Sequence, residues 1–168
     1  SIKMNDRVPI ARWCPSTRSG QVASTSNISR LNLDENCYLF DASGFIYEAA
    51  ATSTQTVNRF TLYAPLDVAR GEPPAVSAVE PLLATIANAE KLPAALDFAR
   101  QLDTLGSSVN RVVIRGDEVD DHLASGTRIT YVLGNERNAF TALVSARDNF
   151  NLADGSIDYI DLRFDGKV

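Results

Sequence analysis

The segment at residues 157–164 alternates between two kinds of side chain, which is the pattern of a strand with one buried face. Apolar residues fall on one face of the extended segment and mostly polar residues on the other: Ile160, Leu162 and Phe164 against Tyr159, Asp161 and Arg163. Both a strand inside a sheet and a strand at its edge fit this pattern. At an edge, the open backbone groups could accept a strand from a partner.

Other segments with the pattern of a strand, either alternating or apolar, occur in both halves of the chain. Strand patterns are present at residues 2–14, 37–40, 45–49, 58–63, 111–115, 119–123 and 128–132. Pro9 interrupts the first of them, and Gly44 suits the tight turn of a hairpin between the second and third. The chain is therefore expected to be rich in sheet.

Three segments have helical spacing instead. Pro81 and Pro93 each suit the first turn of a helix. The apolar residues of these two helices are Leu82, Leu83 and Ile86 in the first, and Leu96, Ala99, Leu102 and Leu105 in the second, which Gly106 ends. A third amphipathic helix carries Phe140, Leu143, Val144 and Arg147, with Asn135 or Asn138 as its cap.

This order of elements predicts an α+β fold: a mainly antiparallel β-sheet with about three helices packed on it. The 168 residues fit a single domain spanning 1–168, and 45% hydrophobic with 22% charged residues is ordinary globular usage. The net charge of −5, with no basic run, argues against nucleic acid as a partner. No stretch is long and apolar enough to be a membrane span.

The residues offer no catalytic or metal-binding motif. Two cysteines and a single histidine fall short of a structural zinc site, and no cofactor is expected. His122 stands alone as a possible base, and a solvated side chain is the simpler interpretation. The acidic cluster beside it is interpreted as a solvated face: Asp117, Glu118, Asp120 and Asp121. The sequence thus predicts no catalytic residues and no enzyme.

The two cysteines stand at the ends of neighbouring strand segments. Cys14 follows the apolar run that ends at Trp13, and Cys37 opens the next strand segment. A disulfide between them would constrain the unfolded chain by ~3 kcal/mol and would indicate an oxidising space outside the cytoplasm. The alternative is two buried free thiols that pack as small apolar side chains. The sequence favours the disulfide.

Three segments, in this order, resemble motifs of one bacterial family. Residues 7–13 (RVPIARW) are similar to the junction strand "ERxPxAxW" of the cell-division proteins FtsQ and DivIB, where the POTRA subdomain passes into the β subdomain. Residues 41–46 (DASGFI) match the following "D-x-x-G" hairpin, and residues 159–165 (YIDLRFD) match the closing "YIDLRF" strand. The resemblance covers nearly the whole chain, with residues 1–12 including the end of the junction strand.

The resemblance implies a non-enzymatic scaffold of the divisome, anchored in the membrane by a helix that this sequence lacks along with the POTRA domain. Its place would be the extracytoplasmic side of the membrane, at the septum. The partners would be FtsB and FtsL, bound by adding a strand beside the last strand. Carried over, the partner-binding positions are Arg163, Phe164, Asp165, Gly166, Lys167 and Val168, with Arg115 as a further candidate upstream.

The sequence departs from the family at the cysteine pair and at the long polar segment between the two cysteines, which are not general family features. A different class of function also fits the composition. A secreted glycan-binding or hydrolase domain would bring acidic groups together only in three dimensions. A pocket lined by Asp and Glu with shifted pKa values would favour that alternative, and a flat surface with an unpaired terminal strand would favour the scaffold.

Overall fold

The computed structural model describes residues 7–15, 37–52, 60–67 and 81–164. Eight strands are present in these parts of the chain: β1 (Ala11–Trp13), β2 (Tyr38–Phe40), β3 (Ile46–Ala49), β4 (Thr61–Tyr63), β5 (Val109–Arg115), β6 (Glu118–Leu123), β7 (Arg128–Val132) and β8 (Tyr159–Asp161). Each predicted strand segment overlaps one of them, and β5 and β6 begin one or two residues before the predicted segments. The α-helices of the described residues are α1 (Leu92–Leu102) and α2 (Glu136–Ala146). Single 3₁₀ turns lie at Ala50–Thr52, Ala89–Lys91, Asp103–Leu105 and Arg147–Asn149.

The eight strands form one mixed sheet in the order β3-β2-β1-β4-β5-β6-β7-β8. Four neighbouring pairs are antiparallel (β1–β2, β2–β3, β5–β6 and β6–β7), and three are parallel (β1–β4, β4–β5 and β7–β8). The prediction of a mainly antiparallel sheet was therefore wrong. Side-chain alternation fixes which face a residue occupies, but it carries no information on strand direction.

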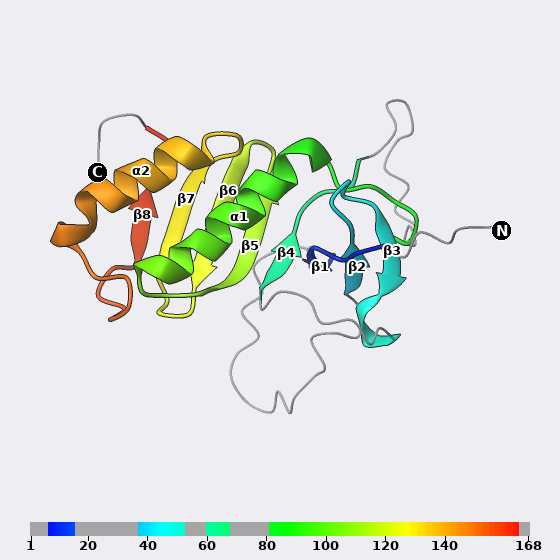
Figure 1. The fold of residues 1–168 in the computed structure, drawn as a ribbon, viewed down its shortest axis with the longest axis horizontal. Helices are drawn as coiled ribbons and strands as arrows, with labels where there is room; N and C mark the ends of the chain where they lie inside the picture. Colours follow the sequence, from blue (N-terminus) through cyan, green and yellow to red (C-terminus); the bar gives the residue numbers. More distant parts are fainter. Residues whose placement is uncertain (1–6, 16–36, 53–59, 68–80, 165–168) are drawn as a thin grey trace.

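The two α-helices lie over the same side of β5 to β8, while β1 to β3 occupy the far end of the sheet (Figure 1). Helix α1 begins with a proline in its first turn and buries one stripe of residues: Leu92, Ala95, Leu96, Phe98, Ala99 and Leu102. Helix α2 buries Ala139 and Leu143. Because this stripe faces the strands, the opposite side of β5 to β8 is left for polar residues.

The first of the three predicted helices, which was to begin at Pro81, is absent from the described residues 81–164. Leu83 and Asn88 have positive φ angles of 70° and 56°, which a right-handed helix does not allow. The segment instead bridges the sheet, because Thr85 pairs with Phe45 and Ile86 pairs with Leu66. In this arrangement Ile86 is buried, so it packs in the core without a helix.

The core is a single cluster that runs the length of the sheet. Trp13 anchors the β1 end, where its indole N–H donates to the carbonyl of Ala64 at 2.8 Å. Tyr131 and Phe98 anchor the helix-covered end, with ring centroids 4.4 Å apart. Gly44 allows the β2–β3 turn, because its φ is +75° and a Cβ there would lie 2.6 Å from Ala89 Cβ.

Candidate functional site

Strand β8 lies at one edge of the sheet and pairs only with β7 among the described strands. The carbonyl of Asp158 accepts from Arg128 N–H at 2.9 Å, and Leu162 N–H donates to the Thr130 carbonyl at 2.8 Å. Backbone groups of successive residues point to opposite sides of a strand. The N–H and C=O groups of Tyr159 and Asp161 therefore face outward, away from β7, and form an open edge.

Arg163 and Arg115, both predicted to bind a partner, meet on the same carboxylate within the chain. Arg163 Nη1 lies 2.6 Å from Glu118 Oε2, and Arg115 Nη2 lies 3.4 Å from Glu118 Oε1. Arg163 also binds Asp161 at 2.7 Å, and Arg115 binds Asp120. The hydrogen bonds from Arg163 lower the pKa of Asp161 to about 2. Arg163 thus ties the end of β8 to β6 across β7, and Arg115 ties β5 to β6.

Phe164 follows this network and is the most exposed of the described residues of the closing motif. Its side chain is 65% exposed, and the Arg163 guanidinium lies 5.5 Å from its ring centroid. A large ring held at the surface beside an open strand edge is a candidate anchor for a partner. The other predicted positions, Asp165, Gly166, Lys167 and Val168, lie outside the described residues.

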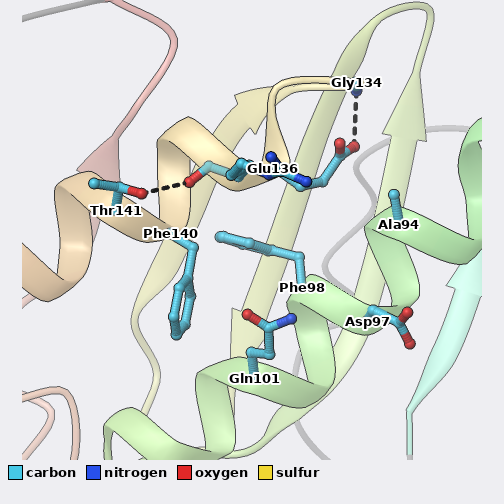
Figure 2. Close-up of a pocket in the computed structure, with 9 residues that line it drawn as sticks. Ala94, Asp97, Phe98, Gln101, Gly134, Glu136, Phe140 and Thr141 are labelled. Atoms are coloured by element: carbon cyan, nitrogen blue, oxygen red, sulfur yellow. Dashed lines mark hydrogen bonds between the residues drawn. The ribbon is translucent and has the colours of Figure 1, made fainter.

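Several cavities open on the described surface. One of about 500 Å³ lies between α1 and α2 (Figure 2). In it, Phe98 and Phe140 stand near Gln101, while Glu136 turns toward Gly134 and accepts its N–H at 2.7 Å. A second, of about 480 Å³, lies beside β8 and is lined by Phe150, Ile157 and Ile160 among others. A third, of about 390 Å³, lies near Cys14 and includes His122.

The acidic cluster is only partly solvated, which corrects the interpretation of Asp120 and Asp121. Asp120 is 3% exposed and bound by Arg115 and by the Thr130 hydroxyl. Asp121 is completely buried on the core face, and neither carboxylate oxygen has a hydrogen-bond partner in the described part of the chain. Burial, and then the charges of Asp120 and Glu136, raise its pKa well above the usual value.

Asp121 has an equally unusual neighbour in the core. The buried hydroxyl of Tyr131 likewise has no hydrogen-bond partner among the described residues, and burial raises its pKa, with a further contribution from Asp121. The alternation of Val119, Asp121 and Leu123 carried the signal for this position, since it places the carboxyl on the core face of β6. The neighbouring acidic residues nevertheless favoured the interpretation of a solvated face.

Acidic side chains line two of these cavities. Asp97 and Glu136 line the one between the helices, and Asp161, whose pKa Arg163 lowers, lines the one beside β8. Asp121, whose pKa is strongly raised, lines none of the three. Within the described residues, no three His, Cys, Asp or Glu side chains gather where they could hold a metal ion. In the same residues, no helix has the length and apolar character needed to cross a membrane.

Cys14 and Cys37 form a disulfide that extends the pairing of β1 with β2. Trp13 is in register with Tyr38, so the two cysteines are the next facing pair along these antiparallel strands. Their Cα atoms are 4.3 Å apart, and both side chains are buried. A buried disulfide of this kind indicates an oxidising environment outside the cytoplasm.

No protein-family model matches this chain, and a search of curated proteins finds no relative.

Proposed function

We propose that this chain is a non-enzymatic interaction domain of the FtsQ/DivIB kind, which binds a partner protein by strand addition at β8. The observation that carries the proposal is the place of the closing motif. The segment that resembles the family's partner-binding strand lies at the edge of the sheet, with the backbone groups of Tyr159 and Asp161 facing outward. An edge of this kind is the usual acceptor for an added strand.

The proposed partners are FtsB and FtsL, and the proposed place is the extracytoplasmic face of the cell membrane at the division septum. The disulfide supports the oxidising side of the membrane. The membrane anchor and the septal location rest on the resemblance of residues 7–13, 41–46 and 159–165 to the family motifs. The domain would then hold its partners by contacts alone, with no chemical step.

Affinity and selectivity would come from different parts of the edge. Main-chain hydrogen bonds to Tyr159 and Asp161 would supply affinity for any extended segment. Phe164 would supply selectivity, because an exposed ring gains most when a complementary side chain covers it. Arg163 would contribute chiefly by fixing β8 through Glu118 and Asp161, since both carboxylates already occupy it.

Replacing Phe164 by alanine is expected to weaken partner binding by about 1–3 kcal/mol and to leave the fold intact. The ring is 65% exposed, so its loss removes partner contact rather than core packing. The measurement is a calorimetric titration of the domain with a soluble extracytoplasmic segment of FtsB. Leu83→Ala is the matched control, because Leu83 is another exposed apolar side chain, 75% exposed, in the segment that pairs with β3 at the other end of the sheet.

Unchanged affinity in the Phe164→Ala protein would remove Phe164 from the interface. Absence of any binding by the folded wild-type domain would remove FtsB as the partner. The alternative, a secreted glycan-binding or hydrolase domain, would then be tested with a glycan screen. The cavity between α1 and α2 supports that alternative only through Asp97 and Glu136. The open β8 edge therefore supports the scaffold better.

A further inference from the structure

A row of four side chains crosses the sheet on the face opposite α1. Arg111 of β5 is in register with His122 of β6, His122 with Arg128 of β7, and Arg128 with Tyr159 of β8. The row lies on the polar face because the neighbouring register positions, Val112 and Asp121, are buried in the core. We call these four residues the arginine row.

The arginine row presents hydrogen-bond donors with no carboxylate attached. Arg111 Nη2 lies 3.5 Å from His122 Nδ1, and since a guanidinium only donates, this long contact leaves the second ring nitrogen of His122 as a donor. The Arg128 guanidinium lies 4.6 Å from the Tyr159 ring centroid, a cation–π contact within the row.

The two guanidiniums of the row differ from most others in the molecule. Within the described residues, neither Arg111 nor Arg128 forms an ion pair, although the chain has a net charge of −5. Five other described arginines each bind a carboxylate: Arg7, Arg100, Arg115, Arg147 and Arg163. Two such cations, on β5 and β7 with His122 of β6 between them, leave room for an external anion on an acidic protein.

The row continues into the cavity of about 390 Å³ described above. Besides Arg111 and His122, its lining includes Thr61 and Tyr63 of β4 and Asn110 of β5. These side chains offer a ring face, hydroxyls and an amide, which are the groups that bind a peptide backbone or a small polar side chain. Cys14 and Leu123 complete the lining, so the surface is a charged row that ends in a pocket with both polar and apolar walls.

We propose that the arginine row and this cavity bind an acidic peptide segment of a partner protein, with one carboxylate on Arg111 and another on Arg128. Strands β5 and β7 are two strand spacings apart, or about 10 Å. A polyproline II segment repeats every three residues and rises about 9 Å over that repeat, so acidic residues three apart match the two arginines. The planar guanidinium suits bidentate binding of each carboxylate.

The neighbouring row of the sheet favours a carboxylate over a phosphate. Two register positions away, Asp120 of β6 and Asp161 of β8 place their carboxylates on the same face. A doubly charged phosphate is repelled by them about twice as strongly as a singly charged carboxylate at the same distance. Tyr159 belongs to both surfaces, with its ring beside Arg128 in the row and its backbone groups at the outer edge of β8, so the two surfaces meet at this residue but use different groups.

The test uses a blocked hexapeptide, Gly-Glu-Pro-Ser-Glu-Gly, and its counterpart with glutamine in place of both glutamates. The chain has a single histidine, so the ring signals of His122 report binding at the row by NMR without ambiguity. We expect the glutamate peptide to shift these signals in a saturable way and to bind about tenfold more tightly than the glutamine peptide. Added salt is expected to weaken the binding.

Arg111→Gln combined with Arg128→Gln is expected to weaken binding of the glutamate peptide about tenfold. The matched control is Arg137→Gln combined with Arg147→Gln, which makes the same change in charge on and just after α2 and should change the affinity less than twofold. Phe164→Ala should leave peptide binding unchanged, which separates this site from the one at β8.

Several results would overturn the proposal. They are equal affinity for the two peptides, no binding of either, or the same loss in the control variant. Inorganic phosphate that shifts the His122 signals as strongly as the glutamate peptide would show a general anion site instead. The comparison of the two peptides uses the wild-type protein, so it decides the question even where the double variant fails to fold.

Discussion

Replacing Cys14 and Cys37 together by alanine is expected to lower the free energy of unfolding by about 3 kcal/mol. The disulfide joins residues separated by 23 positions, so it removes much of the conformational freedom of the unfolded chain. Alanine is the suitable replacement because both positions are buried and a hydroxyl there would need a hydrogen-bond partner. For a chain of this length, the melting temperature should fall by roughly 6–12 °C.

The measurement is urea unfolding of the wild-type and variant proteins, each with and without a reductant. A reductant should bring the wild-type protein down to the stability of the variant and should leave the variant unchanged. This comparison separates the covalent bond from the packing of the two side chains. Equal stability of the oxidised and reduced wild-type protein would show that the bond does not stabilise the fold, and would weaken the argument for an oxidising environment.

Replacing Asp121 by valine is expected to raise the free energy of unfolding at pH 7 by about 1–3 kcal/mol. Asp121 is fully buried and its oxygens have no partner among the described residues, so folding removes it from water without compensation. Valine fits the strand, where Val119 and Leu123 occupy the same face. The change therefore removes a cost of folding rather than adding a new contact.

The same variant should change how stability depends on pH. Burial raises the folded-state pKa of Asp121 above its ordinary value of 3.8, so the folded protein holds this proton more tightly than the unfolded chain does. The contribution of Asp121 to stability is therefore fully present below pH 3.8. It declines as the pH rises from 3.8 to the folded-state pKa. The difference in stability between Asp121→Val and wild type should widen over this range.

Urea unfolding from pH 3 to pH 8 measures this difference, with Asp117→Asn as the matched control. Asp117 is exposed, so its replacement alters the net charge without altering a buried group. The control should follow the wild-type pH profile within about 0.5 kcal/mol. A wild-type protein that gains stability relative to Asp121→Val as the pH rises would show that Asp121 is ionised and paired in solution.

The strands of this fold were predictable, and their directions were not. Alternation or a short apolar run located all eight strands, because burial of one face imposes a period of two and burial of both faces favours an apolar run. The parallel pairs β1–β4, β4–β5 and β7–β8 depend on how the chain crosses over between strands, which local sequence does not record. The helix expected after Pro81 does not form for a related reason. Thr85 and Ile86 pair with residues distant in the sequence, Phe45 and Leu66, and these pairings determine the conformation of the segment.

The candidate site was predictable to a similar degree. The closing motif drew attention to Arg163 and Phe164, and alternation allowed an edge strand there without requiring one. The meeting of Arg115 and Arg163 on Glu118 joins residues from different strands, so no local pattern contains it. The arginine row could not be found for the same reason, because Arg111 and Arg128 become neighbours of His122 only through the register of three strands.

The order of strands in the sheet also sets how this chain can reach its fold. Strand β4 lies between β1 and β5, and the residues that it pairs with on each side are about fifty positions away along the chain. Pairing of β4 with β1 and with β5 therefore closes long loops. The chain loses conformational entropy before the new contacts compensate for it, so this fold forms more slowly than a chain of hairpins. During synthesis, β4 also lacks its neighbour β5 until residues 109–115 have left the ribosome.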